Sequence, residues 1–211
     1  MLLSGGIDSA TSLYVVRAKR NVRALTFEYN RIARKEIESA KAIASHAKVM
    51  EHRIVRLPDL RESGDIPGFV SHGLPPTYIP LRNSIFYSFA ASYAEETGAG
   101  LVVGGHNRDD LDVLPDVGRG FFRALEAALW KGSPTLRRDK VRIVRPLSRM
   151  RKVEVITLAA SLGVPFELTW SCHRDGKRHC WRCQGCLSRR KSFRAAMVED
   201  PLDESNMAKI T

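Results

Sequence analysis

The sequence predicts an α/β protein: a Rossmann-like open parallel sheet with helices on both faces, followed by a small four-cysteine module. Strand-like and helix-like segments alternate over the first 57 residues, an order typical of parallel sheets covered by helices. A glycine-containing turn leads from the first apolar residues into the first helix, as at the ligand-binding edge of such sheets. All cysteines lie between residues 172 and 186. We therefore divide the chain into an α/β domain, residues 1–166, and a cysteine module with a C-terminal helix, residues 167–211, packed as one compact unit.

Residues 1–57 are expected to supply the first strands and helices. Residues 10–16 follow the turn and are expected to begin a helix, and the apolar, β-branched run 22–27 is expected to be a strand. Apolar residues recur at helical spacing from Ile37 to Ala47, which predicts a helix over 32–47. Ile54 and Val55 predict a strand within residues 49–57.

The later elements follow a long connection. Residues 58–80 contain five prolines and three glycines with little periodicity, so we expect a lid, a binding loop or a disordered segment there. Helices are expected at 84–97, 120–130 and 153–162, and short strands at 101–103 and 141–144. Residues 106–110 come directly after the strand at 101–103, at the carboxyl end where open α/β sheets bind their ligands.

Charge and hydropathy limit the choice of partners. The chain has 211 residues and 34 Lys and Arg against 23 Asp and Glu, a net charge of +11. A basic chain attracts polyphosphates and nucleic acid, so direct nucleic-acid binding is kept as an alternative. We find no apolar run long enough to span a bilayer and no secretory signal, so we expect no membrane partner and a cytoplasmic protein.

The turn at residues 4–9, Ser-Gly-Gly-Ile-Asp-Ser, is predicted to bind the phosphates of ATP. Amide groups in the first turn of a helix lack helical partners and lie at the positive end of its dipole. Gly5 and Gly6 let the backbone approach an anion closely, and Ser4 and Ser9 add hydroxyl donors. Asp8 is expected to be either a helix cap or a ligand of the Mg²⁺ that arrives with ATP. The alternative is an ordinary serine–glycine turn.

The cysteine spacing predicts a metal site. The pattern C-x7-C-x2-C-x2-C uses every cysteine of the chain, and such tight spacing in a chain expected to be cytosolic indicates metal rather than disulfides. Four thiolates suit tetrahedral Zn²⁺, although similar spacing also occurs in iron–sulfur proteins. We expect structural zinc, with His173 and His179 as surface residues. The four predicted ligands are Cys172, Cys180, Cys183 and Cys186.

Several motifs resemble those of known enzymes. Residues 4–9 resemble the SGGxDS loop of PP-loop ATP pyrophosphatases, and residues 167–172, Glu-Leu-Thr-Trp-Ser-Cys, with the cysteines that follow, resemble the 7-cyano-7-deazaguanine synthase family of the queuosine and archaeosine pathways. Residues 25–29, 78–83, 115–116 and 152–156 also resemble segments of that family, so the likeness spans residues 2 to about 194. Asn30 and Leu81 stand where the family has glycine. Residues 106–110 are more similar to a segment of tRNA-modifying PP-loop enzymes.

The resemblance implies a fold of PP-loop type, a homodimer, ATP with Mg²⁺, and structural zinc. It implies conversion of 7-carboxy-7-deazaguanine and ammonia to the 7-cyano product through adenylated intermediates. Asp8, Arg82 and Lys152 are the candidate catalytic residues, because their charges can act on phosphate or its metal. The candidate substrate-binding residues are Asp110, Asp116, Arg82 and Trp170, and His106 is a candidate base.

Each of these residues also has a purely structural interpretation. Lys152 could be an exposed lysine at a helix start and Arg82 an ion-pair partner, the two aspartates could be loop or cap carboxylates, and Trp170 and His106 could simply pack. Two other functions stay open: a tRNA-modifying PP-loop enzyme, such as a thiolase, and a metal-stabilised binding protein without catalysis. A thiolase normally needs a spare cysteine to carry sulfur, and this chain has none if all four bind metal.

Overall fold

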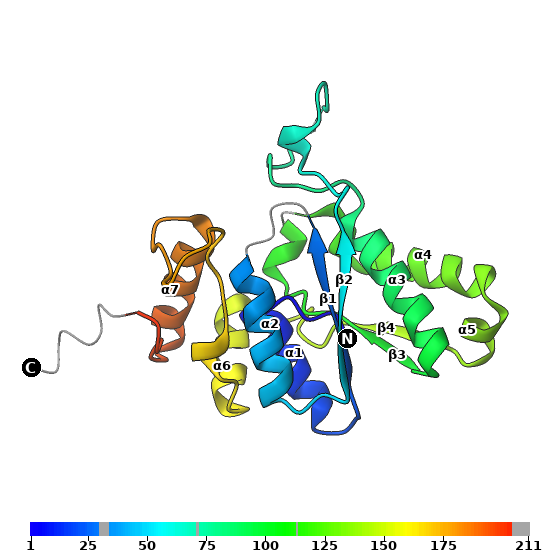
Figure 1. Cartoon of the computed structure of the whole chain (residues 1–211), viewed down its shortest axis with the longest axis horizontal. Helices are drawn as coiled ribbons and strands as arrows, with labels where there is room; N and C mark the ends of the chain where they lie inside the picture. The colour runs from blue at the N-terminus through cyan, green and yellow to red at the C-terminus, as the bar shows by residue number, and fades with distance from the viewer. Residues whose placement is uncertain (30–33, 71, 113, 204–211) are drawn as a thin grey trace, which may run out of the picture.

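The computed structural model describes residues 1–29, 34–70, 72–112 and 114–203, and its helices and strands alternate as expected. Figure 1 shows a twisted sheet between two groups of helices. The strands are β1 (Arg23–Tyr29), β2 (Glu51–Leu57), β3 (Leu101–Val103) and β4 (Arg142–Val144). The helices are α1 (Ile7–Arg17), α2 (Arg34–His46), α3 (Arg82–Thr97), α4 (Arg119–Gly132), α5 (Pro134–Arg138), α6 (Lys152–Ser161) and α7 (Gln184–Ala196).

Residues 1–3 join two parallel strand pairs into one sheet. β1 pairs with β2 and β3 pairs with β4, both in parallel. Between the pairs, the amide of Leu3 donates to the carbonyl of Leu25 at 2.8 Å, and the amide of Leu2 donates to the carbonyl of Val103 at 2.8 Å. The spatial order is therefore β2, β1, residues 1–3, β3 and β4. From residues 1–3 the chain first forms β1 and β2 on one side of this central segment, and later forms β3 and β4 on its other side. Ligands of open α/β sheets bind where the strand order reverses in this way.

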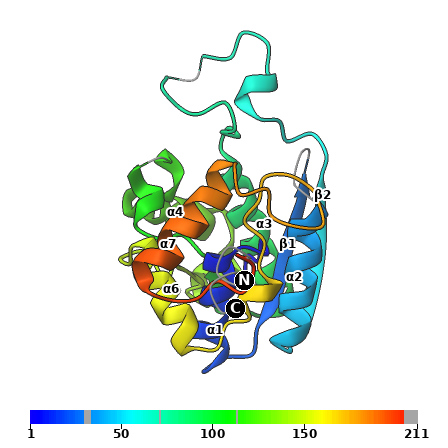
Figure 2. The same cartoon turned by 90° about the vertical axis from the view of Figure 1, so that its left-hand side faces the viewer.

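Each face of the sheet is buried by its own set of helices (Figures 1 and 2). One apolar cluster unites α1, α2, α6 and α7 through side chains such as Leu13, Ile43 and Ile156. The other unites α3, α4 and α5 through side chains such as Tyr87 and Phe122. Both faces of the parallel sheet are covered, which confirms the predicted fold class.

The cysteine module does not form a separate layer. Its helix α7 packs on α6, and Phe193 of α7 lies in the same apolar cluster as Ile156 and Ala159 of α6. The boundary after residue 166 stays a prediction, and residues 204–211 lie outside the described part of the chain.

Most elements lie where the sequence placed them, within a few residues. The helix α5 was not anticipated; Pro134 is its first residue, and the hydroxyl of Ser133 accepts a hydrogen bond from the amide of Leu136 at 3.1 Å. The described residues 58–70 and 72–80 contain a short 3₁₀ turn, Ser63–Asp65, and extend away from the sheet in Figure 1. Within the described residues, none of the helices combines the length and the apolar character needed to cross a bilayer.

Leu81 has a backbone conformation that favours glycine. It precedes α3 with a φ of 53°, in the left-handed region that costs a non-glycine residue about 1 kcal/mol or more. Asn30, the other residue that stands in place of a family glycine, lies outside the described residues.

Candidate active site

The turn at residues 4–9 is held tightly against its surroundings. Gly5 has a φ of +83°, and a Cβ there would lie 2.3 Å from the carbonyl oxygen of Glu36 in α2, so only glycine fits. The hydroxyls of Ser4 and Ser9 lie 3.0 Å apart, and the hydroxyl of Ser9 also accepts from the amide of Ser4 at 3.1 Å. These hydroxyls therefore shape the turn as well as lining the cavity beside it.

Asp8 does not cap α1. The N-cap residue is Gly6, which provides no side-chain cap, and Asp8 lies in the first turn of the helix. One carboxylate oxygen of Asp8 contacts the ammonium group of Lys152, and the other accepts a hydrogen bond from the side-chain amide of Asn107 at 3.3 Å. The capping interpretation of Asp8 is therefore wrong, and the carboxylate lies beside the turn with a lysine and an amide as partners.

The loop after β3 lies against the start of α1. A Cβ on Gly105 would lie 2.8 Å from the amide nitrogen of Ser9, so the two turns approach backbone to backbone. In the same loop the carboxylate of Asp110 accepts from the amide of Asn107 at 2.9 Å, and the carboxylate of Asp109 accepts from the amide of Lys152 at the start of α6 at 2.9 Å. These contacts place the loop, the turn and α6 around one point at the carboxyl edge of the sheet.

A cavity of about 680 Å³ opens at this point. It is lined by the turn at residues 4–9, the end of β1, the start of α3, the segment 75–79 and the loop after β3. The predicted site residues on its wall are Ser4, Gly6, Asp8, Ser9, Arg82, His106, Asp110 and Asp116. Lys152 joins them through Asp8. The structure therefore brings together residues separated by more than 100 positions in the chain.

Trp170 is placed differently. Its side chain is 8% exposed and packs against Cys172 and Cys186. Only its backbone reaches the turn, where the amide of Trp170 donates to the carbonyl of Gly5 at 3.0 Å. The packing interpretation of this tryptophan matches its surroundings, and its ring does not line the cavity.

Two predicted side chains near the cavity have structural partners. The buried carboxylate of Asp116 accepts a hydrogen bond from the amide of Asn83 in the first turn of α3 at 3.2 Å. His106 stacks on Tyr87 with ring centroids 6.0 Å apart, and burial lowers the pKa of His106 to about 4. The imidazole is therefore neutral at neutral pH and a weak base.

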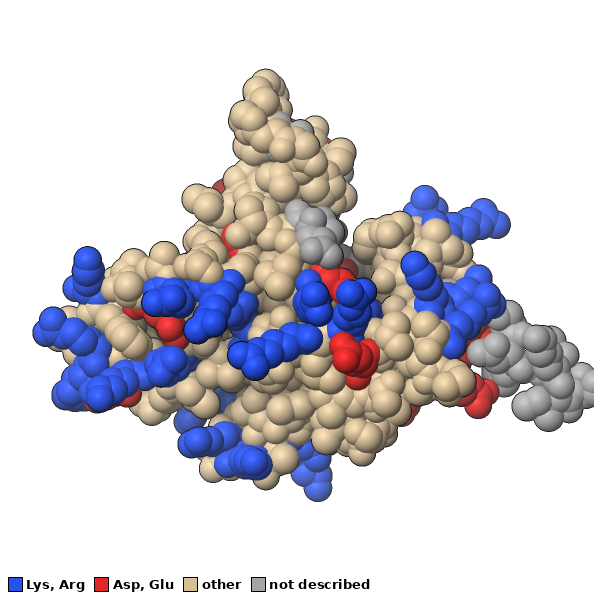
Figure 3. Space-filling view, turned by 180° about the vertical axis from the view of Figure 1, so that it is seen from behind, with Lys and Arg blue, Asp and Glu red and all other residues tan. Residues whose placement is uncertain are grey.

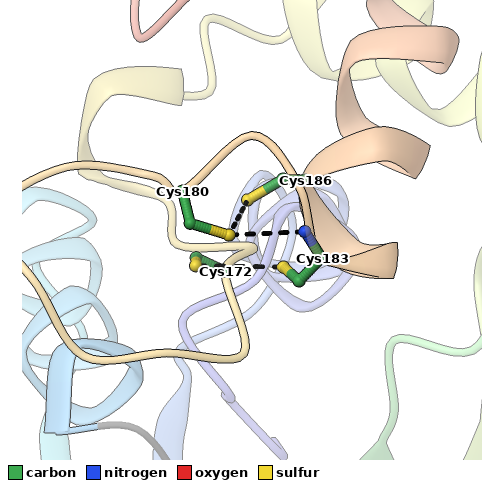
Figure 4. A group of neighbouring side chains, drawn as sticks. All are labelled: Cys172, Cys180, Cys183 and Cys186. Atoms are coloured by element: carbon green, nitrogen blue, oxygen red, sulfur yellow. Dashed lines mark hydrogen bonds between the residues drawn. The ribbon is translucent and has the colours of Figure 1, made fainter.

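The four cysteines form a compact thiol cluster. Figure 4 shows their sulfur atoms pointing toward one another from the loop before α7 and its first turn. All four Sγ atoms lie within 4.8 Å of one another, and two pairs are 3.9 Å apart. A tetrahedral ion with metal–sulfur bonds of about 2.3 Å has sulfur atoms about 3.8 Å apart, so the cluster fits one four-coordinate ion.

His179 is not the surface residue that we expected. It is 6% exposed, its ring lies 4.3 Å from that of Trp170, and its Nε2 accepts a hydrogen bond from the amide of Ser171 at 3.0 Å. The partly buried amide of Ser171 finds its acceptor in this ring, which gives the histidine a structural role beside the thiols. His173 is exposed, as predicted.

The chain is similar in sequence to a known family over most of its length. The model of the family described as "Queuosine biosynthesis protein QueC" matches residues 1–197. The chain belongs to the QueC family. The 7-cyano-7-deazaguanine synthase of Trichodesmium erythraeum is 38% identical and is aligned over 96% of this chain and 98% of its own. That of Thermoplasma acidophilum is 37% identical over 96% of this chain and 90% of its own.

A solved structure of a distant protein has the same fold. NMN synthetase from Francisella tularensis superposes with a TM-score of 0.52 at 17% identity, over 98% of this chain and 70% of that one. This likeness concerns the fold alone. The QueC relatives confirm the family resemblance that the turn at residues 4–9 and the cysteine module predicted.

Glu36 lines the cavity of this QueC-family protein and was not among the residues predicted from the sequence. It lies in the first turn of α2. Burial raises the pKa of Glu36 to about 7, while the guanidinium of Arg82 opposes the rise and the carboxylate of Asp175 adds to it. A glutamate in an amphipathic helix is usually exposed, so nothing in the sequence marked this position, and Arg82, whose charge acts on it, lies 46 residues away in the sequence.

The raised pKa of Glu36 predicts a pH-dependent stability. The folded chain keeps a proton that the unfolded chain loses between pH 4.5 and about 7, so the free energy of unfolding falls as the pH rises through this range. We expect Glu36→Gln to be more stable than the unsubstituted chain at pH 8 by roughly 1–3 kcal/mol, with the difference gone near pH 4. Urea unfolding across this pH range measures it. Glu38→Gln, an exposed position on the same helix, is the control; the same pH trend in both variants would contradict the assignment to Glu36.

A buried arginine ties the cysteine module of this QueC-family chain to the turn. Arg189 of α7 is 1% exposed and forms a bidentate pair with Asp200, with N···O distances of 2.6 and 2.8 Å. Its guanidinium also donates to the hydroxyl of Thr169 at 2.8 Å and to the carbonyl of Phe166 at 3.2 Å. Thr169 precedes Trp170, whose amide binds Gly5, so α7 fixes the segment that supports the turn.

We expect Arg189→Met to lower the free energy of unfolding by about 3–5 kcal/mol, because it leaves the Asp200 carboxylate buried without its cation. The double variant Arg189→Met/Asp200→Leu removes both charges and is expected to recover most of the loss. Denaturant titrations of the three chains measure the difference. A single variant within about 1 kcal/mol of the unsubstituted chain would show that the pair does not stabilise the module.

Proposed function

We propose that this chain is a 7-cyano-7-deazaguanine synthase that activates its substrate with ATP. The observation that carries the proposal is the cavity where the strand order reverses. There the Ser-Gly-Gly turn, the pair of Asp8 and Lys152, and several buried or partly buried carboxylates meet, in a chain that belongs to the QueC family. Two QueC relatives with the same name align along almost their whole length.

The chemistry requires two activations. A carboxylate resists nucleophiles because of its negative charge, so its oxygen attacks the α-phosphorus of ATP, pyrophosphate leaves, and an acyl adenylate forms. Ammonia displaces AMP from the adenylate, gives the amide and releases a proton. A second ATP adenylates the amide oxygen, releasing pyrophosphate and one of the two amide protons. Loss of AMP and a proton then forms the carbon–nitrogen triple bond.

The residues of the turn have clear roles in this scheme. The free amides at the start of α1 and the close approach that glycine permits suit the departing pyrophosphate, a di-anionic or more highly charged group. Asp8 suits the Mg²⁺ that accompanies ATP, because Mg²⁺ prefers carboxylate ligands. Lys152, which contacts Asp8, and Arg82, which also lines the cavity, would neutralise charge that develops on the phosphates.

The carboxylates on the cavity wall suit the deazaguanine. A guanine-like ring presents N–H donors on one edge, and carboxylates are acceptor-only groups when ionised. Asp110 and Glu36 line the cavity and are both partly buried. Burial raises the pKa of Asp110 to about 6, so it remains mostly ionised at neutral pH. Asp116 also lies on the wall, where its amide contact with Asn83 leaves lone pairs for a ligand.

We assign the thiol cluster to structural zinc. Four thiolates at these separations suit a closed tetrahedral site, which has no open position for a substrate. An iron–sulfur cluster distributes its thiolates over several irons, which requires wider spacing than 4.8 Å. Metal analysis of the purified protein tests this: one equivalent of zinc and no colour are expected, and iron with visible absorption would contradict it.

The experiment that tests the function is a pyrophosphate-release assay. ATP, ammonia and 7-carboxy-7-deazaguanine are expected to give pyrophosphate, with the cyano product identified by mass spectrometry. Release that requires tRNA instead of the deazaguanine acid would favour the tRNA-modifying alternative, and no turnover under either condition would favour a binding protein. The homodimer implied by the family stays a prediction, which light scattering tests.

A further inference from the structure

Two stretches carry most of the excess positive charge of the chain: residues 174–194, which surround the cysteine cluster, and residues 119–151, which are far from it in the sequence. Residues 119–151 contain ten Lys and Arg against two Asp and Glu, whereas residues 1–118 contain fourteen of each kind and are neutral overall. Residues 119–151 therefore carry a net charge of +8 on about a sixth of the chain. The stretch comprises α4, α5, β4 and the turn that leads to α6.

The charges of this stretch lie on the surface. Nine of the ten basic side chains are exposed, and Figure 3 shows Lys and Arg gathered over the α4–α5 side of the molecule, at the left of that view. Arg138 pairs with Asp139 and Arg142 with Glu126. Among the residues that the structure describes, Arg119, Arg123 and Arg137 have no acidic partner within 4 Å.

The chemistry of this surface selects among polyanions. Seven of the nine exposed cations are arginines, whose planar fork binds phosphate in a bidentate manner. A surface that inserts into lipid places exposed apolar side chains among its cations. None of the described large apolar side chains in residues 119–151 is exposed. The surface thus suits a hydrated chain of phosphates.

We propose that the α4–α5 surface binds the phosphate backbone of a nucleic acid. α4 begins at Arg119, three residues after Asp116, which lines the cavity, so the surface starts close to that cavity in the chain and continues from α4 to α5. Its contacts are electrostatic and independent of base sequence. Phosphate binding here is separate from the turn at residues 4–9 and from the nitrile-forming reaction.

Fluorescence anisotropy with a labelled RNA stem-loop, and with a DNA duplex of equal length, tests the proposal across a salt series. We expect binding at low salt, and the triple variant Arg119→Gln/Arg123→Gln/Arg137→Gln should reduce the slope of log K against log [salt] by about 2–3. The control triple Lys19→Gln/Arg20→Gln/Lys41→Gln removes the same charge from exposed positions elsewhere and should leave most of the binding intact. Both triples should release pyrophosphate at the unsubstituted rate.

The outcomes separate the sources of phosphate. Binding of RNA alone, DNA alone or both supports the proposal and identifies the partner. Equal loss of binding in the two triple variants would overturn it, because the effect would then come from net charge. Binding to vesicles of anionic lipid without binding to either nucleic acid would overturn it in favour of a membrane surface, and so would the absence of any binding at low salt.

Discussion

Asp8→Asn is expected to reduce pyrophosphate release by at least ~10²-fold while the chain stays folded. Asparagine has the shape of aspartate and can still accept from Asn107, but it cannot hold Mg²⁺ as a carboxylate does, and it leaves Lys152 without a counter-charge. The side chains of Asp8 and Lys152 are 25% and 21% exposed, so solvent screens their attraction. Loss of the ion pair is therefore expected to change the free energy of unfolding little. The measurement is steady-state release with saturating ATP.

Lys152→Met tests the other half of the pair. It should also reduce release strongly, because one cation beside the phosphates is lost, whereas Lys19→Met at an exposed position should not. Circular dichroism melting curves confirm that each variant is folded. Normal turnover in both Asp8→Asn and Lys152→Met would refute the placement of the phosphate site at residues 4–9.

Cys186→Ser is expected to remove the metal and unfold the cysteine module. Cys186 is fully buried and belongs to the cluster whose four thiols lie within 4.8 Å. Binding of structural zinc supplies roughly 10–16 kcal/mol in small metal-folded domains, far more than a module of this size gains from its apolar contacts. We expect proteolysis to begin in residues 167–197, and pyrophosphate release to be lost, because Trp170 then no longer holds Gly5.

His173→Ala is the matched control for the cysteine variant. It changes a metal-binding residue type within the same module, but His173 is exposed and is not one of the four clustered groups. Metal content by plasma emission and the number of reactive thiols distinguish the two variants. Full metal content in Cys186→Ser would show that the cluster does not hold the ion.

Features that depend on neighbouring residues were predictable from the sequence. The turn at residues 4–9 combines glycine and hydroxyl side chains within six positions, and the cysteines lie within fifteen, so both signals survive without knowledge of the fold. The alternation of helices and strands predicted the sheet for the same reason. α5 was missed because it spans five residues, too few for helical periodicity to appear.

Features that depend on distant residues were not predictable. His179 carries no sequence mark of its contact with the amide of Ser171, and Arg189 carries none of its pairing with Asp200. Glu36 lines a cavity whose other walls come from distant parts of the chain. Trp170 belongs to the most specific motif of the chain, yet its position beside the turn comes from its backbone, which no residue type encodes.

The phosphate turn is clamped from two directions, by the backbone of α2 behind Gly5 and by the amide of Trp170 in front of it. The turn therefore already has the conformation in which it binds an anion, so little chain entropy is lost on binding. A preorganised turn can hold both the phosphates of ATP and the departing pyrophosphate. Adaptation to substrates of different size is then expected from other parts of the cavity wall, such as residues 75–79.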